Sequence, residues 1–213
     1  VLPDRAVTVG KLSFTLQNIA TIAGANVEVI EASAFYNNKL TSIDFPNLRE
    51  VGDSALQSNS LTSVDLSKVE KIGVSAFQTN RITALDLPVV TEIGNYAFAG
   101  NLVATLTAPE VLTIGVEAFF RQPIKTLELP KVTVIGTRAF SNGGVLESVT
   151  LPQVLTIGLE AFESNIIKEL YAPNVQTIGD KAFNSNRLTL IELPNVQTIG
   201  SQAFRYNRIT EAY

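Results

Sequence analysis

The sequence predicts a solenoid, a stack of similar coils, because one unit of 21 residues recurs along most of the chain. An Ala-Phe pair marks each unit, and neighbouring pairs are 21 residues apart except at one step of 22 residues. Apolar residues also keep one register from Ile30 to Ile209, which indicates a continuous core shared by all units. The nine marker pairs are Ala34-Phe35, Ala55-Leu56, Ala76-Phe77, Ala97-Phe98, Ala118-Phe119, Ala139-Phe140, Ala161-Phe162, Ala182-Phe183 and Ala203-Phe204.

Each unit contains a stretch that predicts one short β-strand. We number a unit from the apolar residue four places before its Ala, so that Ile30 occupies position 1. Positions 11, 14 and 16 hold large apolar residues such as Leu61, Val64 and Leu66, and position 15 points outward, which is typical of a strand with one buried face. Position 17 is Pro in seven of eight units, with Ser67 as the exception, and Pro ends a strand because it has no N–H. Strands that recur in one direction pair in parallel, about 4.8 Å apart.

The turns of the unit also carry recurring residues. Position 2 is Gly in eight of nine units, Glu31 being the exception, which predicts either a positive φ or a close approach of backbone. The Ala at position 5 fits where only a methyl group has room. The Phe at position 6 predicts a ladder of rings that contributes a large share of the buried apolar surface.

Position 9 is Asn in seven units, and two interpretations are open for these amides. They bind backbone groups of the turns, or they contact a ligand; the first interpretation is favoured because turn peptides inside a coil need partners. Gln122 and Gly143 are the exceptions. The single 22-residue step falls at Gly143-Gly144, which predicts a small bulge there.

The two ends differ from the regular units. We expect residues 1–29 to be an N-terminal cap with a degenerate repeat and a hairpin at Gly10-Lys11, and residues 30–213 to form nine repeats, the last one incomplete. The last residues, Glu211 to Tyr213, fall inside the strand of the ninth unit. An uncapped C-terminal end would expose the apolar cross-section of the ninth coil. We therefore expect self-association at that end.

The composition of the chain argues against several classes of function. The net charge of −4 and the pI of about 5.0 argue against nucleic-acid binding, and no apolar run reaches the roughly 20 residues that span a bilayer. The chain has neither Cys nor His, and it lacks phosphate-loop and metal motifs. We therefore expect no enzyme activity, no metal and no cofactor.

The unit Leu-Thr-x-Leu-x-Leu-Pro-x-Val-x-x-Ile-Gly-x-x-Ala-Phe-x-x-Asn resembles the BspA-like, or treponemal, class of leucine-rich repeat, over residues 30–213. The resemblance implies a right-handed solenoid with a parallel concave sheet, one strand per 21-residue repeat and short turns or 3-10 segments on the convex side. Members are mostly bacterial surface or secreted proteins implicated in adhesion. The resemblance thus implies an extracellular or cell-surface, non-catalytic module that binds a protein through its concave face. The alternative is a structural spacer that displays another domain, although nine strands extend only about 40 Å.

The outward position 15 supplies the candidate ligand-binding residues: Asp44, Asp65, Asp86, Glu128, Tyr171 and Glu192, with Thr107 and Thr150 between them. Like charges on neighbouring strands are destabilising, and Asp is a poor strand residue. The column either keeps an open sheet soluble or recruits a basic protein segment or a divalent cation. Oxygen ligands of this kind suit calcium rather than zinc.

A second column, at positions 20 and 3, becomes apolar in the middle units. Its members are Leu112, Val116, Leu155 and Leu159, with Phe120 nearby. These side chains either pack against neighbouring coils or form an exposed apolar patch for a partner.

Overall fold

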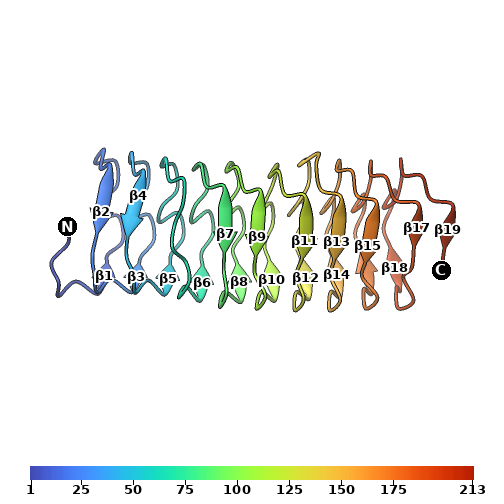
Figure 1. Ribbon diagram of the computed structural model, residues 1–213, viewed down its shortest axis with the longest axis horizontal. Coiled ribbons are helices and arrows are strands. Elements are labelled where there is room, and N and C mark those ends of the chain that lie inside the picture. Colours follow the sequence, from blue (N-terminus) through green and yellow to red (C-terminus); the bar gives the residue numbers. More distant parts are fainter.

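Two short strands in most coils form the fold of this chain. The computed structural model describes residues 1–213 and contains parallel strands joined by turns, without any helix (Figure 1). One set of strands lies at positions 21 and 1: β1 (Thr8–Val9), β3 (Val29–Ile30), β5 (Glu50–Val51), β6 (Lys71–Ile72), β8 (Glu92–Ile93), β10 (Thr113–Ile114), β12 (Val134–Ile135), β14 (Thr156–Ile157), β16 (Thr177–Ile178) and β18 (Thr198–Ile199). The other set lies at positions 13 to 15: β2 (Thr21–Ala23), β4 (Ser42–Asp44), β7 (Ala84–Asp86), β9 (Thr105–Thr107), β11 (Thr126–Glu128), β13 (Ser148–Thr150), β15 (Glu169–Tyr171), β17 (Leu190–Ile191) and β19 (Glu211–Ala212).

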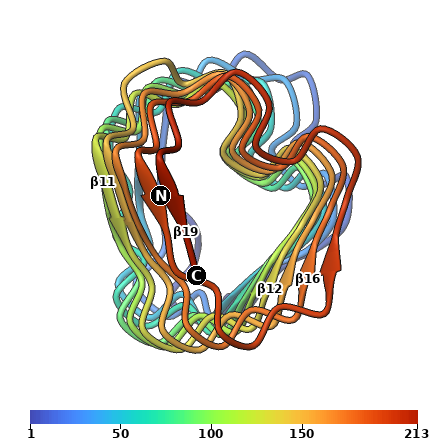
Figure 2. The same cartoon turned by 90° about the vertical axis from the view of Figure 1, so that its right-hand side faces the viewer.

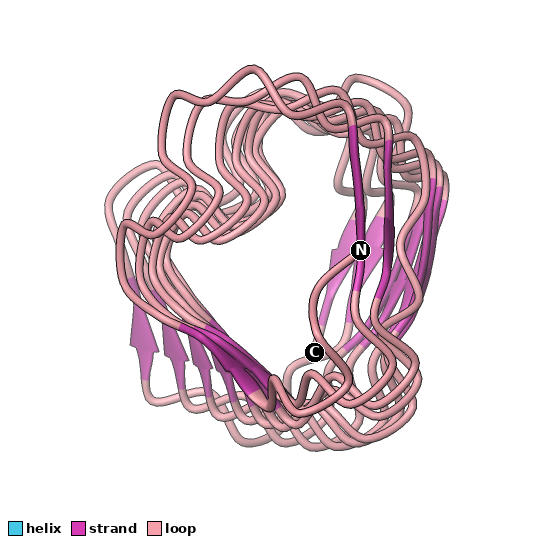
Figure 3. Cartoon of the chain, turned by 90° about the vertical axis from the view of Figure 1, so that its left-hand side faces the viewer, coloured by secondary structure: helices cyan, strands magenta, loops and turns pink.

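The first set forms one continuous ten-stranded parallel sheet, in the order β1-β3-β5-β6-β8-β10-β12-β14-β16-β18. The second set forms four separate sheets, β2-β4, β7-β9, β11-β13-β15 and β17-β19. Figures 2 and 3 show the two sets on different sides of the coil cross-section.

The predicted parallel solenoid with a 21-residue repeat is confirmed. It differs from the expectation in having two strands per coil, and in Figure 1 the coils stack along an almost straight axis. No helix of the structure is long and apolar enough to cross a membrane.

The predicted Phe ladder is confirmed and forms the centre of the core. Rings at position 6 stack from Phe77 to Phe204, with neighbouring centroids 5.1 to 5.5 Å apart. Leu56 interrupts the ladder between Phe35 and Phe77 and is itself fully buried. Apolar contacts join 53 buried residues into one cluster, so the coils share a single core.

The Gly at position 2 serves close approach of successive coils, the second of the two predicted reasons. A Cβ built on Gly94 would lie 2.6 Å from the carbonyl carbon of Gly73, and Gly94 has no positive φ. Positive φ falls instead at positions 4 and 8, on residues such as Ser54 and Ser58. Any side chain at Gly94 would therefore push two backbones apart.

The Asn side chains at position 9 bind backbone groups, as predicted. Asn59 is buried; its Oδ1 accepts the N–H of Leu40 at 3.0 Å, and its Nδ2 donates to the carbonyls of Phe35 at 2.9 Å and Leu56 at 3.1 Å. Gln122 takes over this role in its own coil, where its Oε1 accepts the N–H of Val103 at 2.8 Å. These amides join each coil to the one before it, and no buried side-chain nitrogen or oxygen lacks a partner.

The extra residue of the 22-residue step is accommodated at Gly143 and Gly144, where the bulge was predicted. Gly144 has a φ of 72°, and its N–H donates to Oδ1 of Asn165 at 3.1 Å. In Figure 2 one yellow loop stands out from the stack at the upper left.

The predicted N-terminal hairpin is wrong. Thr8 and Val9 pair in parallel with Val29 and Ile30, one coil later, rather than with a neighbouring antiparallel segment. The Phe14 ring stacks on Phe35 with centroids 5.3 Å apart. This stretch is therefore a further coil in register with the others, because its apolar residues recur with the same spacing. Its role as a cap stays a prediction.

Candidate functional site

The outward side chains at positions 13 and 15 form one face along the solenoid, which we call the strand face. Position 14, between them, points inward and is buried or half-buried from Ile43 to Ile191. The strand face consists of Ser42, Asp44, Ser63, Asp65, Ala84, Asp86, Thr105, Thr107, Thr126, Glu128, Ser148, Thr150, Glu169, Tyr171, Leu190, Glu192, Glu211 and Tyr213. Seven of these residues are carboxylates and none is basic, so the face is acidic along its length.

The three N-terminal aspartates do not form the predicted ladder on consecutive strands. Asp44 ends β4 and Asp86 ends β7, but the coil between them has no strand at this place. There Oδ1 of Asp65 accepts the backbone N–H of Ser67 at 3.0 Å. This bond is available only because position 17 is not Pro in this coil.

Hydrogen bonds from Ser67, first from its backbone N–H, hold the pKa of Asp65 below its ordinary value, and nearby Lys68 adds a smaller effect in the same direction. Asp65 therefore has a local structural partner. No group of three or more His, Cys, Asp or Glu side chains lies close enough to hold a metal ion. The geometry gives the calcium hypothesis no support.

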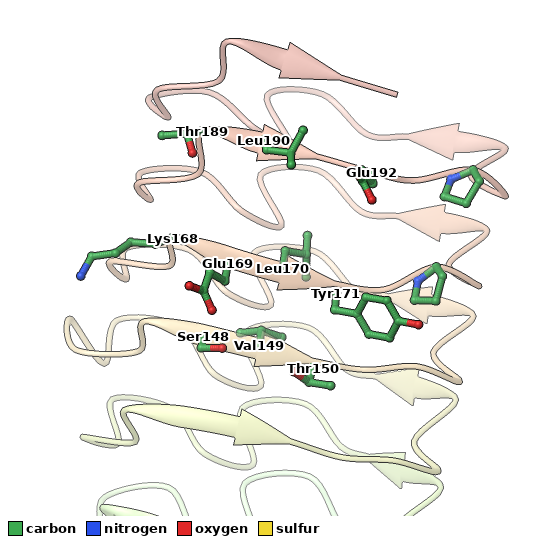
Figure 4. Close-up of a pocket in the computed structure, with 12 residues that line it drawn as sticks. Ser148, Val149, Thr150, Lys168, Glu169, Leu170, Tyr171, Thr189, Leu190 and Glu192 are labelled. Carbon is green, nitrogen blue, oxygen red and sulfur yellow. The ribbon is translucent and has the colours of Figure 1, made fainter.

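Further along the strand face, a depression of about 390 Å³ lies over β13, β15 and β17 (Figure 4). Its lining comprises Ser148, Val149, Thr150, Lys168, Glu169, Leu170, Tyr171, Pro173, Thr189, Leu190, Glu192 and Pro194. β15 and β17 are not paired by backbone hydrogen bonds, and we call this unpaired boundary between neighbouring coils the open ladder. The depression lies partly over it. Of the predicted ligand-binding residues, it brings together Tyr171 and Glu192; the other four lie outside it.

The depression presents two carboxylates and two apolar groups in alternating order. β15 carries Glu169 and then Tyr171, whereas β17 and the residue after it carry Leu190 and then Glu192. Tyr171 is 57% exposed and Leu190 is 41% exposed, so both side chains are accessible to a partner. The sequence reasoning missed Glu169 and Leu190 because it followed position 15 alone; position 13 faces the same way, since strand side chains alternate.

The N-terminal side of the depression is flanked by paired charges at position 12. Nζ of Lys168 lies 2.7 Å from Oε2 of Glu147, and this hydrogen bond lowers the pKa of Glu147. Neither Glu169 nor Glu192 takes part in an ion pair or a side-chain hydrogen bond. The free carboxylates of the depression are therefore these two.

The predicted apolar patch is only partly assembled. Leu112, Leu155 and Leu159 are exposed, whereas Val116 and Phe120 are half-buried. Leu112 is separated from Leu155 and Leu159 because the coil of Thr133 lies between them. The patch stays a hypothesis.

Comparison with known proteins bears on the family and the fold. A family model described as BspA type leucine rich repeat region (6 copies) matches residues 1–105 and 112–213. No curated protein matches the chain. A leucine rich cell surface protein from Faecalibacterium prausnitzii A2-165 has a similar crystal structure, with a TM-score of 0.53 and 23% identity over 92% of this chain and 69% of that chain.

Two further solved structures have lower TM-scores. The pneumococcal vaccine antigen PcpA gives 0.42 with 17% identity, covering 91% of this chain and 64% of its own. A leucine-rich repeat protein from Bacteroides ovatus ATCC 8483 gives 0.42 with 15% identity, covering 94% of this chain and 80% of its own.

Proposed function

This chain belongs to the BspA-type leucine-rich repeat family, and we propose that it is a non-catalytic module that binds a positively charged segment of another protein through its strand face. The observation that carries the proposal is the charge of that face, with seven carboxylates and no basic side chain. We further propose that the module acts in adhesion at a bacterial cell surface or outside the cell. The structural similarity to the cell surface protein of F. prausnitzii supports this location.

The carboxylates of the strand face do not face one another across paired strands, because Asp86 is paired with Thr107 and Glu128 with Thr150. A neutral residue on the neighbouring strand keeps like charges apart, but no basic side chain of the face compensates their negative charge. A basic partner segment would supply the missing positive charge. An extended field of one sign also accelerates association with a partner of opposite sign, and salt weakens that effect.

The alternative function, a spacer that displays another domain, draws support from the continuous ten-stranded sheet and the stacked rings. These features make a stiff rod. A spacer needs its core, and an acidic strand face would serve it only by keeping the open sheet soluble. Substituting the charges of that face would therefore leave a spacer's function intact and separates the two functions.

The test compares two variants with the same change in net charge. One carries Asp44→Asn, Asp65→Asn, Asp86→Asn and Glu128→Gln on the strand face. The control carries Glu50→Gln, Glu70→Gln, Glu92→Gln and Glu110→Gln, away from that face. Each chain is immobilised and used to capture proteins from serum and from extracellular-matrix extract at several salt concentrations. We expect proteins that wild type and control retain to be lost by the strand-face variant; identical capture by all three chains contradicts the proposal.

A further inference from the structure

Two aromatic rings of this chain carry a guanidinium on one face, each from a residue next to it in the sequence. The Arg205 Cζ lies 4.4 Å from the centroid of the Tyr206 ring, and the Arg121 Cζ lies 4.9 Å from that of Phe120. Such contacts are attractive because the face of an aromatic ring is electronegative. Tyr171 has no cation of its own.

The nearest basic side chain of the depression is not free to supply that cation. Lys168 is bound to Glu147 at 2.7 Å, and Figure 4 shows it extending away from Tyr171. The ring of Tyr171 is therefore exposed, aromatic and unpaired on a face that otherwise carries negative charge. A cation that covers it has to come from another molecule.

One free carboxylate of the depression lies on the same strand as Tyr171, and the other lies on the next coil (Figure 4). Glu169 is two residues before Tyr171 on the same strand, about 7 Å away along the chain. Glu192 occupies the same position as Tyr171 in the next coil. A planar cation resting on the ring could direct its edge N–H groups toward either carboxylate, and Leu190 adds an apolar contact.

The depression spans three strands of the strand face. β13 and β15 are paired, whereas β15 and β17 are not, and the depression of about 390 Å³ lies over all three. The volume is sufficient for one long side chain, since a single water occupies about 30 Å³.

We propose that this depression binds one arginine side chain of an extended partner segment, with the guanidinium on the ring of Tyr171 and its N–H groups bound to Glu169 and Glu192. The inference rests on the proposed protein-binding function and assigns its anchor. Arginine fits better than lysine because its planar fork stacks on rings and binds carboxylates through two N–H groups. In an extended segment the residue two places after the arginine points the same way and would lie over Leu190.

The probe is the peptide Gly-Arg-Ser-Val-Gly-amide with a net-neutral rhodamine label on its N-terminal amine, followed by anisotropy at low salt. Matched peptides carry lysine or the neutral isostere citrulline in place of arginine. We expect the arginine peptide to bind more tightly than the lysine peptide and the citrulline peptide to bind least. We expect Tyr171→Leu to weaken binding about threefold, as for an exposed cation–π contact, and Tyr171→Phe to leave it nearly unchanged.

Further variants test the carboxylates and the location. Glu169→Gln with Glu192→Gln should weaken binding several-fold and remove most of its salt dependence. Tyr206 is also an exposed tyrosine and lies outside the depression, so Tyr206→Leu is the control and should bind like wild type. All substituted side chains are exposed, so thermal unfolding followed by circular dichroism should be unchanged.

The proposal is overturned if the arginine peptide does not bind, if the citrulline peptide binds equally well, or if Tyr206→Leu weakens binding as much as Tyr171→Leu. Failure here is distinguishable from failure of the proposed function. If the four-site strand-face variant loses captured proteins while Tyr171→Leu keeps them, the acidic face binds a partner and the arginine anchor is wrong.

Discussion

Replacing Phe119 by Ala tests the ring ladder that holds the coils together. Phe119 is 1% exposed, and its ring stacks on Phe98 at 5.4 Å and on Phe140 at 5.2 Å. Removing a buried Phe ring lowers the free energy of unfolding by about 3–5 kcal/mol, and loss of two stacked contacts places this site toward the upper end. For a chain of this size about 4 kcal/mol corresponds to a fall in Tm of roughly 8–16 °C.

The measurement is thermal and urea unfolding followed by circular dichroism. The chain supplies its own control, because Leu56 occupies the ladder position in one coil and is fully buried there. Phe119→Leu should therefore lower the Tm clearly less than Phe119→Ala does. If the alanine variant melts within a degree of wild type, stacking and burial of the rings do not stabilise the solenoid and the account of the core fails.

Four other predictions concern backbone packing, buried amides, pH and the chain end. Gly94→Ala should prevent native stacking or lower the urea midpoint sharply, because its Cβ would lie 2.6 Å from backbone of the preceding coil; an unchanged midpoint contradicts the close approach. Asn59→Ala should lower the free energy of unfolding by at least about 2 kcal/mol, because it leaves the N–H of Leu40 and two backbone carbonyls without a hydrogen-bond partner. Urea titration measures this loss. The pKa of Asp65 is lowered in the folded state, so its small contribution to stability is present above about pH 4 and lost as the pH falls through the folded pKa; Ser67→Pro should return that pKa toward its ordinary value, as an NMR titration would report. For the 213-residue chain by itself we expect the mass from light scattering to rise with concentration, because β18 and β19 expose strand edges; a strict monomer at all concentrations argues against this association.

The sequence by itself determined the solenoid, its period and its core. In a stack every coil meets a copy of itself one unit away, so a residue that recurs at one position forms a ladder wherever it points inward. This is why Phe119 could be assigned as stacked and buried from recurrence, whereas for Asn59 recurrence left backbone binding favoured over ligand contact and the structure decided between them. The acidic character of the strand face was predicted for the same reason, since alternation in a strand places position 15 outward.

Only the tertiary structure decided which strands pair and where side chains find partners. Pairing depends on displacements between coils that a shared 21-residue pattern does not encode, so the open ladder between β15 and β17 and the depression over it could not be predicted. From the sequence, Ser67 is only an exception to the Pro at position 17. The structure shows that its backbone N–H is the hydrogen-bond partner of Asp65. The sequence alone could not decide whether Gly94 is needed for a positive φ or for a close approach of backbone, because glycine is compatible with both. The short distance to Gly73 in the neighbouring coil shows that close approach is the reason.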